Sequence, residues 1–435
     1  MTPRFSSAIG LVALLSISPL SAANWPGWRG ANGSGVTSER NLPTRWSDTE
    51  NVRWKFALPD RGNSTPVIWG DKVFLTQPLE KENQRTLLCL SRRDGKVLWQ
   101  KSVTWDKPEE SHDTNPYCSG SPVTDGERII VWYGSAGVFC YDLNGKELWR
   151  RDLGPQTHGW GYGSSPLLHG SLCILYHGPA KPGFLVALDI KTGEIKWKTE
   201  EPALQKRART DGFRGRDAGG VVGTFTSPLI VKAGARSELI MTYPQLMCAY
   251  DPATGKELWR CDGLNELVYA SPVFADGLVI GMGGFFGSAI GVKPGGSGDV
   301  TQTARVWREE RAKKNRCGSA VAHGNHVYLA NMEGFVECIE AKTGTVHWSE
   351  RLPAKGPKSE SWSSMVLAGD LIYILNQSGD CTVMKASPKF EVVATNAVGN
   401  EMCNASVAVS NGDLFIRTHK HLWCIGEPRR TASAR

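Results

Sequence analysis

The chain has 435 residues and a formal net charge of +7, and 40% of its residues are hydrophobic while 21% are charged. A chain of this length can bury a large core without disulfides or metals, and its composition, without long runs of one charge, excludes wholesale disorder. The mild positive charge favours anionic surfaces, but no pattern in the sequence indicates binding to nucleic acid.

The first predicted element is an export signal at residues 1–23. Arg4 supplies a positive charge, Ala8 to Leu20 is apolar, and the small residues Ser21, Ala22 and Ala23 resemble a cleavage site. The alternative is a buried N-terminal strand or helix. We expect an exported protein, periplasmic or extracellular after cleavage near Ala23. No other stretch is apolar enough to cross a bilayer.

Residues 24–50 form an N-terminal extension, and from residue 51 to residue 428 the chain is built from repeats. Each repeat unit opens with Ser or Thr, usually followed by Pro, and five units end at a Gly turn followed by Trp. The fifth unit inserts the Gly-rich segment Gly291 to Thr303 before Trp307, and the seventh has Phe390 where Trp is expected. The openings lie 42 to 62 residues apart at Thr65, Ser121, Ser165, Ser227, Ser271, Ser319, Ser364 and Ser406. This period is the length of one four-stranded blade of a β-propeller.

Each unit supplies four β-strands separated by turns, and long segments of helical period are absent, which predicts an all-β protein. Eight openings predict an eight-bladed β-propeller. The last unit stops before its Trp strand, while the segment Asn51 to Phe56, which contains Trp54, has no preceding strands of its own. We expect this segment to complete the eighth blade, to close the ring and to cover an exposed sheet edge. Counts of seven or nine blades stay open.

The eleven cysteines are interpreted as packing residues rather than as a disulfide framework. Cys89, Cys140 and Cys338 recur at one strand position of the repeat, as expected of small buried hydrophobic residues. The odd number leaves at least one free thiol, and no Cys-x-x-Cys pair indicates a redox or zinc site. The pairing state of the cysteines stays open.

The pattern Asp-x-x-Thr-Gly-Lys/Glu-x-x-Trp, at Asp189–Trp197 and Asp251–Trp259, resembles the tryptophan-docking repeat of the pyrroloquinoline-quinone (PQQ) propeller superfamily. The WD repeat fits less well, since its Gly-His and Trp-Asp pairs do not recur. The resemblance implies that the repeated indole packs between neighbouring blades. The residues in this docking position are Trp54, Trp99, Trp149, Trp197, Trp259, Trp307 and Trp348.

The superfamily contains quinone-dependent dehydrogenases and propellers without a cofactor. In the dehydrogenases a disulfide between adjacent cysteines lies over the quinone, and a calcium held by Glu, Asn and Asp polarises it. This sequence has no adjacent cysteines and no stretch that matches the calcium motif. We therefore predict no cofactor, no metal and no catalytic residue. A PQQ- and calcium-dependent alcohol or sugar dehydrogenase is the alternative.

Binding residues are expected on the loops that lead from each outer strand to the next inner strand, because these gather at one mouth of the channel. His112 beside Asp113 is equally explained as a turn, and Trp160 and Tyr162 as a plug of the channel. The candidate ligand or partner residues are His112, Asn115, Tyr117, His158, Trp160, Tyr162, Arg214, Arg216, Asn315, Arg316, Trp362, Glu401 and Asn404.

The sequence thus favours a monomeric, non-catalytic exported scaffold that binds a protein or glycan partner of the cell envelope through its loop face. In repeat and size it is similar to the propeller subunit of the bacterial outer-membrane β-barrel assembly machine, which implies a role in outer-membrane protein assembly. It departs from that subunit in having no cysteine after the cleavage site for a lipid anchor. The tail 429–435 is expected to be disordered.

Overall fold

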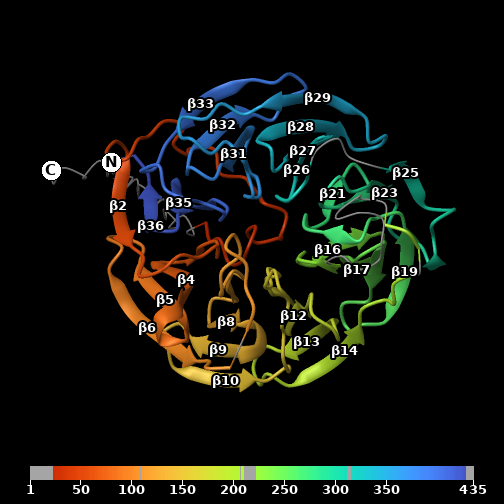
Figure 1. Ribbon diagram of the computed structural model, residues 1–435, viewed down its shortest axis with the longest axis horizontal. Helices are drawn as coiled ribbons and strands as arrows, with labels where there is room; N and C mark the ends of the chain where they lie inside the picture. The colour runs from red at the N-terminus through yellow and green to blue at the C-terminus, as the bar shows by residue number, and fades with distance from the viewer. Residues whose placement is uncertain (1–22, 108, 206, 210–221, 311–314, 428–435) are drawn as a thin grey trace, which may run out of the picture.

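Eight antiparallel four-stranded sheets are arranged as blades around a central axis in the computed structural model (Figure 1). The structure describes residues 23–107, 109–205, 207–209, 222–310 and 315–427. Nearly all of the expected export signal and the expected disordered tail lie outside these residues. The prediction of an all-β, eight-bladed propeller is confirmed.

The two inner strands of each blade follow directly after its opening residue. The innermost strands are β3 (Val67–Trp69), β7 (Val123–Thr124), β11 (Leu167–His169), β16 (Leu229–Ala233), β21 (Val273–Ala275), β26 (Val321–His323), β30 (Val366–Ala368) and β34 (Ala408–Ser410). The second strands are β4 (Lys72–Leu79), β8 (Arg128–Trp132), β12 (Leu172–His177), β17 (Arg236–Thr242), β22 (Leu278–Met282), β27 (His326–Ala330), β31 (Leu371–Leu375) and β35 (Asp413–Arg417).

The two outer strands complete each sheet. The third strands are β5 (Gln84–Ser91), β9 (Val138–Asp142), β13 (Phe184–Asp189), β18 (Leu246–Tyr250), β23 (Ala289–Val292), β28 (Phe335–Glu340), β32 (Cys381–Lys385) and β36 (His421–Ile425). The outermost strands are β6 (Val97–Thr104), β10 (Glu147–Arg151), β14 (Ile195–Glu200), β19 (Glu257–Asp262), β25 (Arg305–Glu309), β29 (Val346–Arg351), β33 (Val392–Asn396) and β2 (Val52–Ala57).

A few short elements are added to this plan. β1 (Val36–Thr37) pairs in parallel with β30, and β24 (Gly298–Asp299) pairs in parallel with β19. β15 (Gly223–Thr224) and β20 (Leu267–Val268) form a separate two-stranded sheet. The described helical segments are the 3₁₀ turns η1 (Glu80–Glu82) and η2 (Gly134–Ala136). Within the described ranges no helix is long and apolar enough to cross a membrane.

The ring closes through a strand from the beginning of the chain. β2 pairs antiparallel with β36 of the last unit, with Trp54 opposite Cys424. This arrangement confirms the expectation that the N-terminal segment completes the eighth blade. It also covers the edge of β36, which would otherwise expose unpaired backbone groups.

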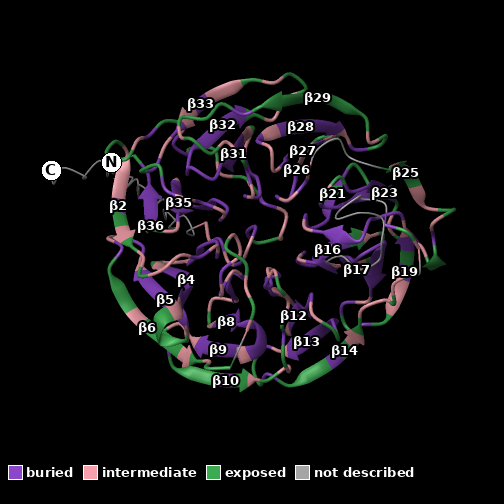
Figure 2. Ribbon diagram, in the orientation of Figure 1, coloured by how far each residue is buried: buried purple, intermediate pink, exposed green. Residues whose placement is uncertain are grey.

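Burial follows the position of a strand in its blade (Figure 2). Second and third strands such as β8 and β18 are almost wholly buried, because neighbouring blades pack on both of their faces. Outermost strands such as β10 keep a buried Trp among exposed residues. This explains why the inner strands are rich in Val, Ile and Leu, as in sheets that are covered on both sides.

The indoles of the outermost strands reach into the next blade. Trp149 Nε1 donates to the carbonyl of Ile190 at 3.0 Å, and its ring lies where a Cβ on Gly193 would approach to 2.5 Å. Gly193 has a φ of +70°, which a residue with a Cβ adopts at a cost. Trp54, Trp99, Trp197 and Trp307 make the same indole bond to the next blade.

Two of the predicted docking tryptophans make other contacts. Trp259 Nε1 donates to the Glu238 carboxylate at 2.9 Å, and Trp348 packs against Phe390 with ring centroids 5.2 Å apart. In both cases the following blade lacks the Gly turn. The fifth blade carries the Gly-rich insertion 291–303 there, and the seventh carries Ser387 to Phe390.

The segment 24–50 crosses the ring (Figure 1). Its backbone bonds Ile68 of the first blade through Trp25, with both N–O distances at 2.9 Å. The buried Arg29 guanidinium then donates to the carbonyls of Ser319 at 3.2 Å, Met365 at 3.4 Å and Ala320, in the sixth and seventh blades. Burial lowers the pKa of Arg29 to about 9. This segment therefore joins opposite sides of the propeller.

Candidate functional site

The residues that open the repeat units form a closed ring of hydrogen bonds around the axis. In every blade the backbone N–H of the opening residue donates to the side-chain hydroxyl of the next opening residue. Seven of these N–O distances are 2.8 to 2.9 Å. The eighth, from Ser406 N to Thr65 Oγ1, is 3.2 Å and closes the ring. The residues of the ring are, in order, Thr65, Ser121, Ser165, Ser227, Ser271, Ser319, Ser364 and Ser406. This hydroxyl ring holds the inner ends of all eight blades in register.

A cavity of about 270 Å³ lies at the hydroxyl ring, in the centre of the propeller. Six hydroxyl-ring residues line it. Ser227 and Ser271 instead line a small neighbouring hollow. Trp28, from the segment that crosses the ring, lines both spaces. Its indole therefore lies at the level of the hydroxyl ring and bounds the cavity there.

A second ring of side chains forms the rim of the cavity. In every blade the rim residue stands two positions before the opening residue of the repeat, and all eight rim residues line the cavity. They are Asn63, Ser119, Gly163, Phe225, Tyr269, Cys317, Trp362 and Asn404. The repeat thus places one residue per blade at the rim. Seven of these residues carry side chains that vary around the circle, and Gly163 carries none.

Aromatic rings gather on the side of blades four and five. Phe225 and Tyr269 have ring centroids 5.5 Å apart, and Tyr269 and Phe285 have centroids 5.7 Å apart. Trp160 lies 6.1 to 6.4 Å from all three rings. We call these four residues the aromatic wall. Ring pairs at such spacings attract one another beyond the area that they bury.

Amide side chains occupy the side of blades eight and one. Asn63 and Asn404 each donate to the carbonyl of Thr114, at 2.8 and 3.1 Å. Asn115 donates to the carbonyls of Trp160 and Tyr162, at 2.7 and 3.1 Å. These bonds tie the loop 112–117 to the loops on either side of it. The cavity mouth is consequently a connected set of loops.

Five of the residues predicted from sequence line the cavity: His112, Asn115, Trp160, Trp362 and Asn404. His112 also forms the turn that was the alternative interpretation, since its Nδ1 lies 2.9 Å from Thr114 Oγ1.

Other predicted residues lie behind the cavity lining. The Tyr117 hydroxyl donates to the Glu109 carbonyl at 2.5 Å, and Tyr162 packs against Trp132 with ring centroids 4.8 Å apart. The His158 ring lies 5.5 Å from that of Phe225, and burial lowers the pKa of His158. These residues support the loops and are absent from the lining itself.

The charged candidates are held by internal contacts. Arg316 is fully buried and contacts Glu309 at 2.5 Å and Glu337 at 3.0 Å. Glu401 accepts from the Thr418 hydroxyl at 2.6 Å and lies 2.7 Å from His421 Nδ1. These residues hold loops in place rather than face the cavity.

Asn315 is also held internally, since its Nδ2 donates to Glu333 at 2.8 Å. Arg214 and Arg216 fall outside the described residues.

Sequence reasoning missed Phe285 of the aromatic wall, Trp28 at the hydroxyl ring and six of the eight rim residues, namely Asn63, Ser119, Gly163, Phe225, Tyr269 and Cys317. The repeat contained a signal for these six. Each stands two residues before a recognised opening residue, and a period of two places residues on the same face of a strand. Trp28 had no such signal, because it reaches the cavity from outside the repeats.

The family of the chain emerges from comparison with known proteins. Residues 83–215 and 217–425 match the PQQ_2 family, described as outer membrane protein assembly factor BamB. The assembly factor BamB of Burkholderia pseudomallei is 29% identical over 399 residues, covering 80% of this chain and 92% of that protein. The quinohemoprotein alcohol dehydrogenase ADH-IIG of Pseudomonas putida is 24% identical over 248 residues, covering 55% of this chain but 26% of that protein.

The fold agrees with this match. The crystal structure of BamB from Moraxella catarrhalis superimposes with a TM-score of 0.58 at 13% identity, covering 87% of this chain and 97% of that chain. The family match extends over more than half of the chain and includes every blade strand except β2 of the eighth blade and β3 and β4 of the first. The chain therefore belongs to the PQQ_2 family of β-propellers, the family of outer membrane protein assembly factor BamB.

Proposed function

We propose that the protein is an exported, non-catalytic scaffold of outer-membrane protein assembly that binds a protein partner at the cavity mouth. The family match supports the assembly role. The observation that supports a binding site here is the aromatic wall at the mouth of the cavity. Hydrogen bonds from Asn63, Asn115 and Asn404 hold the surrounding loops together.

The chemistry of the lining suits a neutral, extended polypeptide segment. The described lining residues carry hydroxyl, amide, imidazole, thiol, thioether and aromatic groups, and none is Lys, Arg, Asp or Glu. Aromatic side chains supply large contact areas at a low cost in conformational entropy, while the amides and hydroxyls can pair with peptide groups. An aromatic or aliphatic side chain of the partner would lie against Trp160 and Phe285.

A binding measurement with purified proteins tests this proposal. The full chain would be titrated with the fluorescently labelled β-barrel subunit of the assembly machinery and with a urea-unfolded outer-membrane protein. We expect saturable binding to one of them that Trp160→Ala weakens at least tenfold, which corresponds to about 1.4 kcal/mol. The matched control is Phe274→Ala, because Phe274 is an aromatic residue on β21 that is 41% exposed outside the cavity.

Three outcomes would contradict the proposal: no binding to either protein, an equal loss in the Phe274→Ala control, or binding that Trp160→Ala leaves unchanged. Aromatic rings also stack on sugars, so a panel of envelope oligosaccharides belongs in the same titration. Saturable binding of an oligosaccharide at the aromatic wall, with no protein bound, would make the partner a glycan.

A quinone-dependent dehydrogenase is the second candidate, favoured by the similarity to the Pseudomonas putida enzyme. Calcium in proteins is held by oxygen ligands, chiefly carboxylates. The cavity lining within the described chain contains no carboxylate. Its donors therefore do not fit a calcium-bound quinone, and we derive no catalytic step. We expect a titration with PQQ and calcium to leave the absorbance of PQQ and the melting midpoint of the protein unchanged. A calcium-dependent rise in the midpoint would reverse this assignment.

A further inference from the structure

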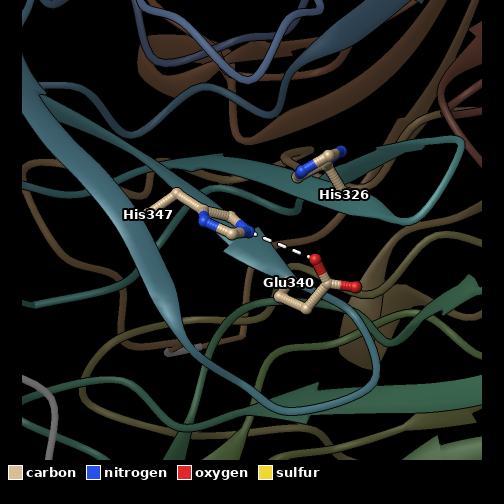
Figure 3. A group of neighbouring side chains, drawn as sticks. All are labelled: His326, Glu340 and His347. Carbon is tan, nitrogen blue, oxygen red and sulfur yellow. Dashed lines mark hydrogen bonds and ion pairs between the residues drawn. The ribbon is translucent and has the colours of Figure 1, made fainter.

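Two histidines and a glutamate meet on three neighbouring strands of the sixth blade, away from the cavity. His326 begins β27, Glu340 ends β28 and His347 lies in β29. His326 and Glu340 are directly paired across the sheet. The pairing of β28 with β29 shifts by one residue next to Glu340. Figure 3 shows the imidazole of His347 facing the carboxylate of Glu340, with the His326 ring beside them.

The donor atoms are close enough to share one metal ion. One nitrogen from each imidazole and one carboxylate oxygen all lie within 4.8 Å of one another. His347 Nε2 lies 3.2 Å from Glu340 Oε2, and the two imidazole centroids are 5.1 Å apart. Zinc binds such donors at roughly 2.0 to 2.2 Å, which places tetrahedral ligand atoms about 3.4 Å apart. Binding an ion would therefore require the more distant donors to move closer together, which the exposed side chain of His347 permits.

A neighbouring side chain already orients the carboxylate. Asn325 Nδ2 lies 3.2 and 3.3 Å from the two carboxylate oxygens of Glu340. Outer contacts of this kind fix the direction of metal ligands and contribute to metal affinity. The site is also accessible, because His326 and Glu340 are half-buried and His347 is exposed.

We propose that His326, Glu340 and His347 form a binding site for Zn²⁺ with a fourth coordination position open to solvent. Imidazole and carboxylate donors are the set that zinc uses in three-ligand sites. The bound ion would join β29 to β28 and β27. β29 is mostly exposed, so the ion would add a link to an outer strand held mainly by its pairing with β28. This site is independent of the proposed function, since none of its three residues lines the cavity.

The test is zinc titration calorimetry on the chelator-treated mature chain without a histidine tag. We expect one equivalent of Zn²⁺ to bind with a dissociation constant in the micromolar range or below. His326→Gln, Glu340→Gln and His347→Gln should each weaken binding at least tenfold. His169→Gln is the matched control, because His169 is a half-buried histidine at the end of an inner strand in the third blade and belongs to no such cluster.

X-ray absorption at the zinc edge provides the second measurement. Nitrogen and oxygen donors near 2.0 to 2.2 Å support the site, whereas sulfur donors near 2.3 Å would assign the zinc to cysteines and overturn it. The proposal also fails if no stoichiometric binding occurs, or if the three cluster variants bind zinc as tightly as the control. His347 is exposed, so His347→Gln should leave the circular dichroism spectrum and melting midpoint of the zinc-free protein unchanged.

Discussion

The backbone N–H of Ser406 donates to Oγ1 of Thr65 across 341 residues of sequence, at 3.2 Å. This bond closes the hydroxyl ring at the inner end of the eighth blade, whose outermost strand is β2. The other seven bonds of the ring are 2.8 to 2.9 Å long. The junction between the two ends of the propeller therefore uses the same donor and acceptor groups as consecutive blades, with a longer bond.

The first prediction concerns this closing bond. Thr65→Val keeps the shape of the side chain but removes the acceptor for the buried Ser406 N–H. An unsatisfied buried donor costs about 1 to 3 kcal/mol, and we expect that loss in the free energy of unfolding measured with urea. Thr343→Val is the control and should change stability by less than about 0.5 kcal/mol, because Thr343 is exposed. Equal effects of the two substitutions would show that the closing bond contributes nothing specific.

The second prediction concerns the indole contact that holds β2. A Cβ on Gly95 would lie 2.6 Å from the Trp54 ring, whereas one on Gly70 would meet nothing within 4 Å. Both glycines have positive φ, so each Gly→Ala substitution carries a backbone cost of about 1 kcal/mol. Steric overlap adds about 1 to 3 kcal/mol at Gly95 alone. Urea unfolding should show Gly95→Ala to be clearly less stable than Gly70→Ala, and equal values would refute the contact.

The third prediction concerns acid stability. His177 is 1% exposed and stacks on Phe184 with ring centroids 4.7 Å apart, and burial lowers its pKa to about 4. Between pH 6.5 and about 4 the unfolded chain therefore binds a proton at this residue that the native state does not. Stability should fall as the pH falls through this window, by on the order of 3 kcal/mol from His177.

His177→Phe isolates that contribution because it keeps a stacked ring but cannot titrate. The urea midpoint of this variant should fall less on acidification than that of the unchanged protein. Parallel curves for this variant and the unchanged protein would refute the assignment to His177.

The fourth prediction concerns the thiols. None of the eleven cysteines forms a disulfide, ten are buried, and Cys317 is half-buried at the cavity rim. Burial raises the pKa of Cys89 and Cys317 to about 12. Since the thiolate is the reactive form, a thiol reagent near pH 8 should modify at most one cysteine in the native protein. It should modify eleven in guanidinium chloride without reductant, and nine or fewer would reveal a disulfide.

The charged loop residues show where sequence reasoning stopped. Arg316 and Glu401 stand on loops that the repeat correctly assigned to the channel mouth. Their hydrogen-bonding partners Glu337 and His421 are 21 and 20 residues away in sequence. A charged side chain turns inward where such a partner offsets the cost of burying its charge. No local pattern in the sequence identifies that partner.

The sequence by itself determined the blades and their closure, because the Ser/Thr openings recur at every unit, the Gly-Trp turns recur at five of them, and Trp54 lacked strands of its own. Only the tertiary structure decided what stands at the centre. Trp28 reaches the cavity along the segment that crosses the ring, and Phe285 joins the aromatic wall from within a blade. His326, Glu340 and His347 likewise meet only once three strands are paired. Repeats specify local pairing, whereas a shared cavity or ligand set depends on where separate segments converge in space.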